Sequence, residues 1–87
     1  MNSNTKNSIN ITAELDSDNM LYLEINGQIV CTEDEVWNKT ELYNYYFLPS
    51  IRECACVNVE AVKPAVSRIV NKLWKNRDVE ISETITA

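Results

Sequence analysis

Three cysteines are the residues of this chain best equipped for chemistry: Cys31, Cys54 and Cys56. Together they could offer three thiolates to a zinc ion. A structural zinc site takes four ligands, however, and the chain has no fourth cysteine and no histidine. A catalytic cysteine would also need a base beside it, for which histidine is the usual residue. We therefore expect no metal and no cofactor, and we interpret the three cysteines as reduced thiols in packed positions.

The carboxylates and the single glycine offer no better route to catalysis. A phosphate-binding loop needs several glycines, and this chain has one. Most acidic residues fall in predicted turns or at a predicted helix start, where structural roles are sufficient to explain them. Without histidine the chain also lacks the commonest general base. The sequence therefore predicts a protein that is not an enzyme and has no catalytic residues.

Aromatic residues cluster in Tyr43-Asn44-Tyr45-Tyr46-Phe47, with Trp37 nearby. A helix cannot turn all of these side chains inward, so some aromatic surface should be exposed or meet a partner. Tyrosine and tryptophan are enriched in protein interfaces. We predict that Trp37, Tyr45 and Tyr46 anchor a protein partner, inside an acidic rim formed by Glu33, Asp34, Glu35 and Glu41. Packing of the aromatic residues as core is the alternative, and the sequence leaves it open.

A row of basic residues offers a second kind of binding site. Arg68, Lys72 and Lys75 lie on one side of a predicted helix, and Arg77 extends the row. Such a row could contact nucleic-acid phosphates, with weak and salt-sensitive binding. Against this alternative, the chain has a net charge of −5 and a sequence pI of about 4.6. Nucleic-acid-binding domains usually carry a basic excess, so nucleic acid is the less favoured partner.

Three strands are predicted in the first part of the chain. Apolar residues recur at every second position, first at Ile9, Ile11, Ala13 and Leu15 and then at Leu21, Leu23 and Ile25. This alternation is typical of strands with one buried face. Asn26-Gly27 suits a type I′ hairpin turn, because both residues tolerate a positive φ. Residues 28–31 should therefore return as the third strand of an antiparallel meander.

A helix should follow from Thr32 to about Leu48. Thr32-Glu33-Asp34-Glu35 fits a capping box, and Pro49 should end the helix. An ideal helical wheel places Val36, Thr40, Tyr43 and Phe47 on one face, and Leu42, Tyr45 and Tyr46 away from it.

The next segment is ambiguous. Alternation over residues 52–59 favours a short strand, whereas Ser50-Ile51-Arg52-Glu53 fits a second capping box or a loop. A second helix begins at Asn58 or Lys63. Pro64 suits a first helical turn and would kink a helix that began at Asn58. The apolar stripe of this helix contains Val59, Val62, Val66, Ile69, Val70 and Leu73. Residues 79–85 alternate again and predict a last strand at the sheet edge.

These elements predict an α+β fold. A three-stranded antiparallel β-meander, with residues 79–85 as a candidate fourth strand, should pack one face against the two amphipathic helices. Residues 1–8 are polar and are expected to form a flexible N-terminal tail, so we assign residues 9–87 to a single domain.

Charge is unevenly distributed along the chain. Residues 1–48 carry eight acids and two bases, and residues 49–87 carry six bases and five acids. Such polarity can steer a charged partner toward the protein. No apolar stretch is long enough for a membrane span, and residues 1–8 lack the apolar core of a secretory signal. We therefore expect a cytoplasmic protein that does not bind membranes.

The sequence thus favours a small acidic protein-binding module. We expect an inhibitor or regulator of a larger protein or of a nucleic-acid enzyme, with a nucleic-acid-binding regulator as the alternative. In size and composition the chain resembles small, acidic, asparagine-rich proteins of phages and other mobile elements, some of which disable host defence systems. No motif carries this resemblance. Homodimerisation, through the aromatic helix or an open strand edge, is a third hypothesis.

Overall fold

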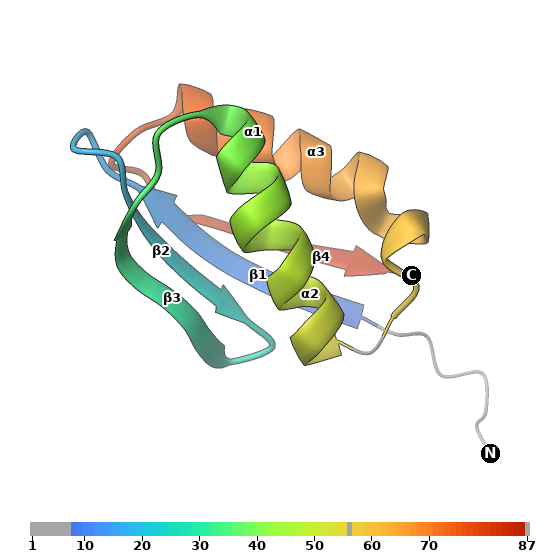
Figure 1. Cartoon of the computed structure of the whole chain (residues 1–87). Coiled ribbons are helices and arrows are strands. Elements are labelled where there is room, and N and C mark those ends of the chain that lie inside the picture. The colour runs from blue at the N-terminus through green and yellow to red at the C-terminus, as the bar shows by residue number, and fades with distance from the viewer. Residues whose placement is uncertain (1–7, 56, 87) are drawn as a thin grey trace, which may run out of the picture.

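The computed structural model describes residues 8–55 and 57–86, except for the side chain of Glu33. One antiparallel sheet has the strand order β3-β2-β1-β4. Its strands are β1 (Ser8–Leu15), β2 (Met20–Ile25), β3 (Gln28–Glu35) and β4 (Ile81–Thr86). The helical segments are α1 (Lys39–Glu41), the π-helical η1 (Leu42–Phe47), α2 (Leu48–Ala55) and α3 (Val59–Lys75). Segments α1, η1 and α2 follow one another without a break, and they lie with α3 on the same face of the sheet (Figure 1). The predicted α+β class, with helices packed on an antiparallel sheet, is confirmed.

The hairpin between β2 and β3 forms at the predicted turn. Asn26 has φ 51° and Gly27 has φ 80°, as a type I′ turn requires. The side-chain Oδ1 of Asn26 also accepts a hydrogen bond from the backbone N–H of Asn10, at 2.9 Å. This bond joins the turn to the neighbouring strand β1.

The core lies between the sheet and the helices. The inward residues of β1 and β2 are those that the alternation predicts, and all are buried: Ile9, Ile11, Ala13, Leu15, Leu21, Leu23 and Ile25. The six predicted stripe residues of α3 are buried against them. Apolar residues that recur at every second position in the strands and every 3.6 residues in α3 therefore pack together in one core.

The predicted capping box at Thr32 is wrong, because β3 continues through these residues to Glu35. Thr32 pairs with Tyr22, and Glu35 pairs with Met20. The pairing shifts register twice along β3, so the strand bends but still follows β2. Pairing with β2 thus overrides a local pattern that fits a helix start.

The helix also does not end at Pro49, as the sequence predicted, but continues to Ala55. The π-helical segment η1 ends at Phe47, two residues before this proline, and the backbone N–H of Leu48 donates to the carbonyl of Tyr43, five residues earlier. Proline lacks the N–H of a regular helical turn, and its ring presses on the preceding turn. We attribute the wider π-turn before Pro49 to this conflict.

The π-turn also makes the predicted helical wheel wrong. Leu42 and Phe47 are both fully buried, whereas Thr40 is exposed. In an i→i+5 turn, residues five apart come to the same side of the helix, which a wheel of 3.6 residues per turn cannot show. Leu42 therefore replaces Thr40 on the buried face.

The short strand considered for residues 52–59 is not formed in the described part of that segment. Arg52 to Ala55 complete α2, and Asn58 caps α3 by accepting a hydrogen bond from the N–H of Glu60. Ser50 also lies within α2, so it caps no helix there. Helix α3 begins at Val59, and Pro64 lies inside it rather than in its first turn.

The strand predicted over residues 79–85 forms as β4 from Ile81 to Thr86, so that Val79 and Glu80 precede it. It pairs with β1 and makes β1 a central strand. Ser8, which we assigned to the tail, is the first residue of β1 and pairs with Thr86. The rest of the predicted tail, residues 1–7, lies outside the described residues.

Candidate functional site

The junction between β3 and α1 holds Trp37 on a fixed backbone. Asn38 is the cap of α1, and its Oδ1 accepts a hydrogen bond from the N–H of Glu41 at 2.8 Å. The Oε1 of Glu41 in turn accepts from the N–H of Trp37 at 2.7 Å. These reciprocal bonds resemble a capping box moved six residues along from the predicted position. They fix the backbone of Trp37, whose side chain remains 67% exposed.

The aromatic run of η1 divides between core and surface. Phe47 is buried, and Tyr43 and Tyr46 are half-buried against the core. Tyr45 is 72% exposed. Of the three predicted anchors, Trp37 and Tyr45 therefore present most of their surface to solvent, whereas Tyr46 presents less.

A hollow of about 440 Å³ lies beside Tyr45. It is lined by Asn38, Thr40, Glu41, Asn44 and Tyr45. Glu41 both lines this hollow and holds the backbone of Trp37. We call Trp37, Glu41 and Tyr45, with this hollow, the aromatic patch. It combines two apolar rings, one carboxylate and short polar side chains, a composition typical of protein interfaces.

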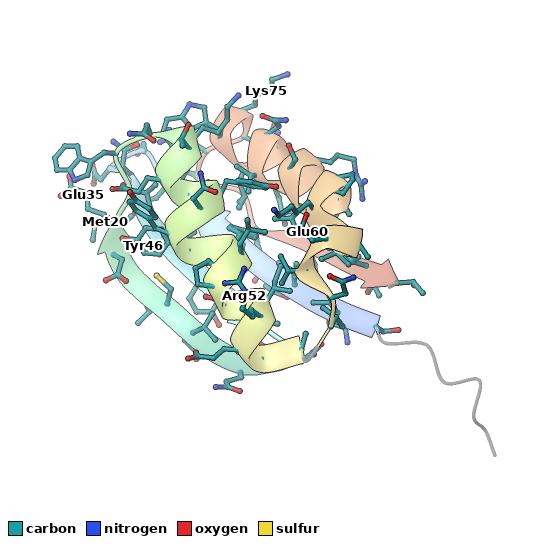
Figure 2. The ribbon with its side chains drawn as sticks, turned by 45° about the vertical axis from the view of Figure 1, so that its right-hand side comes forward. Met20, Glu35, Tyr46, Arg52, Glu60 and Lys75 are labelled. Atoms are coloured by element: carbon teal, nitrogen blue, oxygen red, sulfur yellow. The ribbon has the colours of Figure 1, made fainter. Side chains whose placement is uncertain are left out.

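The predicted acidic rim is brought together in part. The carboxylates of Asp34 and Glu41 lie near the half-buried Tyr46 and, after burial itself, contribute to raising the pKa of its hydroxyl. Glu35 is exposed on β3, and Figure 2 shows it at the same end of the molecule as Met20 and Tyr46. The side chain of Glu33 lies outside the described part.

The thiol of Cys31 is buried and makes a local hydrogen bond. Its Sγ donates to Oδ2 of Asp34 at 3.1 Å. The pKa of Cys31 is raised to about 12, mainly by burial and secondly by this hydrogen bond. At neutral pH the thiol is therefore protonated and a poor nucleophile.

The two other cysteines that were predicted to be reduced thiols are Cys54 and Cys56. Cys54 is half-buried, and burial raises its pKa, with a smaller contribution from Glu53. Cys56 lies outside the described residues. Within residues 8–55 and 57–86 no group of three cysteine or carboxylate side chains is arranged to hold a metal ion.

The predicted basic row is partly engaged inside the molecule. Glu83 on β4 lies 3.1 Å from the Nζ of Lys72 and 3.5 Å from the guanidinium of Arg68. Lys72 is the main cause that lowers the pKa of Glu83. Lys75, near the end of α3, is exposed. No role was predicted for Glu83, whose carboxylate offsets positive charge in the middle of the basic row.

Arg77 has a structural position rather than a place in a free basic surface. Its guanidinium stacks on the ring of Trp74 at 4.4 Å and donates to the backbone oxygen of Asp16 at 3.1 Å and to Oδ1 of Asn19 at 2.6 Å. It thereby joins the end of α3 to the turn between β1 and β2. The i, i+3 spacing of Trp74 and Arg77 was the sequence signal that could have predicted the stacking.

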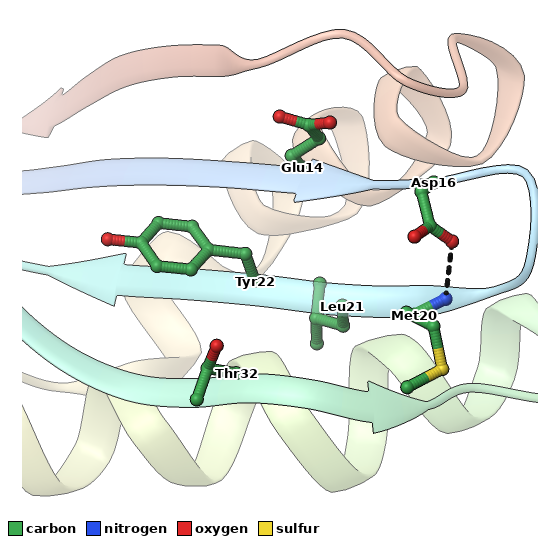
Figure 3. A pocket seen from close by; sticks show the side chains of 6 residues that line it. All are labelled: Glu14, Asp16, Met20, Leu21, Tyr22 and Thr32. Atoms are coloured by element: carbon green, nitrogen blue, oxygen red, sulfur yellow. Dashed lines mark hydrogen bonds between the residues drawn. The ribbon is translucent and has the colours of Figure 1, made fainter.

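A second hollow, of about 200 Å³, lies on the sheet itself and was missed by the sequence analysis. It is lined by Glu14, Asp16, Met20, Leu21, Tyr22 and Thr32 (Figure 3). Glu14 and Thr32 lie directly opposite Tyr22, on the strands to either side of it. The signal was present in the alternation, because Glu14 and Tyr22 occupy polar positions between buried residues.

None of the helices among the described residues has the length and apolar character that crossing a membrane requires. No protein-family model, curated protein or solved structure matches the chain.

Proposed function

We propose that this protein is a non-enzymatic binding module whose aromatic patch docks onto another protein, which it inhibits or regulates. The observation that carries the proposal is the exposure of two aromatic side chains, Tyr45 beside a hollow and Trp37 on a backbone held by a hydrogen bond to Glu41. Large aromatic side chains dominate binding energy in interfaces when they enter a partner's pocket. A fixed backbone supports binding because less conformational freedom is lost on association.

The acidic residues around the patch favour a partner with a basic surface. Asp34 and Glu41 lie close to Tyr46, and Glu35 is exposed two residues before Trp37. Charges at the rim of an interface speed association and select partners more than they add affinity. A nucleic-acid enzyme, whose binding groove is basic, is a partner of this kind, as the sequence analysis also proposed.

The test is capture of partners by the tagged full chain from cells that express it natively, followed by mass spectrometry. The double variant Trp37→Ala and Tyr45→Ala should lose the captured partner while circular dichroism shows an unchanged fold. The matched control is Val79→Ala, which removes another apolar side chain, exposed by 50%. The control should still capture the partner. Equal capture by the wild type and the Trp37/Tyr45 variant would refute the proposal.

A further inference from the structure

No helix among the described residues lies over one face of the sheet. Both helices cover the opposite face (Figure 1), and the strands stand in front of the helices in the close-up view (Figure 3). The side chains of the uncovered face include Asn10, Thr12, Glu14, Tyr22, Glu24, Thr32, Ser82 and Thr84. We call this surface the open sheet face. Antiparallel sheets can leave such a face to solvent when its side chains are polar.

The residues that β1, β2 and β3 contribute to the open sheet face come from a part of the chain that has acidic but no basic residues. Residues 8–38 contain seven acidic residues and no lysine or arginine. The helical span, residues 39–75, contains six basic residues and three acidic ones. Of the acidic residues in 8–38, Glu14 and Glu24 lie on the open sheet face and Asp16 lines its hollow, whereas the basic residues of the helical span belong to the other side of the sheet.

Tyr22 lies on the open sheet face between Glu14 of β1 and Thr32 of β3. The hydroxyl of Tyr22 donates to Oε1 of Glu24 at 2.7 Å. This hydrogen bond is the main cause that raises the pKa of Tyr22, and the carboxylate of Glu80 makes a smaller contribution. Glu14, Glu24 and Glu80 therefore all lie around one aromatic ring that lines the sheet hollow.

We propose that the open sheet face binds a protein surface rich in lysine and arginine, and that one of these cationic side chains enters the hollow beside Tyr22. A cation is attracted both to the face of an aromatic ring and to carboxylates nearby. The alkyl part of a lysine or arginine side chain can also pack against Met20, which lines the same hollow. Nucleic acid does not fit this face, because its phosphates would be repelled by the carboxylates.

This inference goes beyond the aromatic patch and can fail independently of it. The patch predicts loss of a partner when Trp37 and Tyr45 are replaced. The open sheet face predicts binding of cationic side chains that those replacements leave unchanged. The double variant Trp37→Ala and Tyr45→Ala should therefore bind a cationic probe as the wild type does.

The experiment is an NMR titration of the ¹⁵N-labelled full chain at low salt. The probe is a short peptide of alternating lysine and serine, and a peptide of alternating glutamate and serine is its control. We expect the lysine peptide alone to shift the amide signals of Glu14, Tyr22 and Thr32, with affinity that falls as salt is added. Shifts confined to the helices, or no binding at low salt, would overturn the proposal.

Two pairs of variants make the test specific. Glu14→Gln should weaken peptide binding about five- to tenfold, whereas Glu53→Gln, the same charge change on the exposed surface of α2, should weaken it less than about twofold. Tyr22→Phe keeps the ring and should retain binding, whereas Tyr22→Leu should lose it. Equal effects of Glu14→Gln and Glu53→Gln would mean that only net charge matters.

Binding of two other ligands to the open sheet face would also contradict the proposal. If the signals of the open sheet face shift on concentration without any peptide, the face binds a second copy of the chain. If spermidine produces the same shifts at the same concentration as the peptide, the face binds free polyamines rather than a protein surface.

Discussion

At the scale of single residues, Cys31 shows how the fold controls a reactive group. The thiol is enclosed by the core on one side and faces the carboxylate of Asp34 on the other. Both features favour the protonated thiol, because ionisation would place a buried negative charge next to an acid. A residue that offered nucleophilic chemistry in the sequence is therefore chemically quiet in the folded protein.

This raised pKa predicts a fall in stability at alkaline pH. The folded protein holds the thiol proton up to about pH 12, whereas the ordinary thiol pKa is 9.0. The contribution of the protonated Cys31 thiol to the free energy of unfolding is therefore complete below about pH 9, and it is lost as the pH rises from there toward about 12. Above pH 9, the free energy of unfolding should fall by about 1 kcal/mol per pH unit more in the wild type than in Cys31→Ser.

Urea unfolding at a series of pH values would measure this difference. Tyr22 and Tyr46 also have raised pKa values, but they titrate in both proteins, so the difference isolates the thiol. Parallel curves for the wild type and Cys31→Ser would show that Cys31 ionises as readily in the folded protein as in the unfolded chain.

At the scale of elements, the start of the first helix depends on which of two similar segments pairs with β2. Thr32-Glu33-Asp34-Glu35 and Asn38-Lys39-Thr40-Glu41 both fit the capping pattern. The first segment continues β3, and only the second forms a cap. The choice is made by hydrogen bonds to a neighbouring strand, which a pattern read along the chain does not contain.

Replacement of Asn38 should therefore destabilise the protein, and replacement of Thr32 should not. We expect Asn38→Ala to lower the free energy of unfolding by about 1 kcal/mol, because the N–H of Glu41 loses its acceptor. Thr32→Ala, on the exposed side of β3, should change it by less than about 0.5 kcal/mol. Chemical denaturation gives both values, and hydrogen exchange at Glu41 should accelerate only in Asn38→Ala. A larger loss in Thr32→Ala would contradict the observed cap.

The parts of the fold that could be predicted are those set by local periodicity. Alternation predicted β1, β2 and the fourth strand, Asn26-Gly27 predicted the hairpin turn, and the stripe of α3 was predicted residue by residue. The π-turn before Pro49 could not be predicted, because so short a segment with i→i+5 bonds produces no recognisable period of apolar residues in the sequence. Trp37 and Tyr45 could be singled out by type, but their exposure depends on where the helix starts and how η1 turns.

At the scale of the whole molecule, Arg77 joins two segments that are far apart in the sequence. It lies just after α3, yet it bonds to Asp16 and Asn19 in the turn between β1 and β2. Nearby, the N–H of Asp78 donates to the carbonyl of Leu15 at 2.9 Å. These bonds join the end of α3 to the first hairpin, so that α3 is fixed over the sheet at the end where β4 begins.

The guanidinium of Arg77 should not be replaceable by another cation. Lysine keeps the charge, but its ammonium group is not planar and cannot stack on the Trp74 ring as the guanidinium does while it bonds to Asp16 and Asn19. We expect Arg77→Lys to lower the free energy of unfolding by about 1–2 kcal/mol. The matched control is Arg68→Lys, at an exposed residue of α3, which should change it by less than about 0.5 kcal/mol. Thermal and urea unfolding would measure both, and equal effects of the two variants would contradict a structural role for Arg77.

The position of β4 beside β1 has a consequence for the order of folding. The hairpins of β1, β2 and β3 join residues that are close along the chain, but Thr12 and Ser82, which meet between β1 and β4, are 70 residues apart. Closing so long a loop loses more chain entropy than closing a hairpin, and contacts of this range slow folding. The meander should therefore assemble first, and the docking of the fourth strand should limit the overall rate.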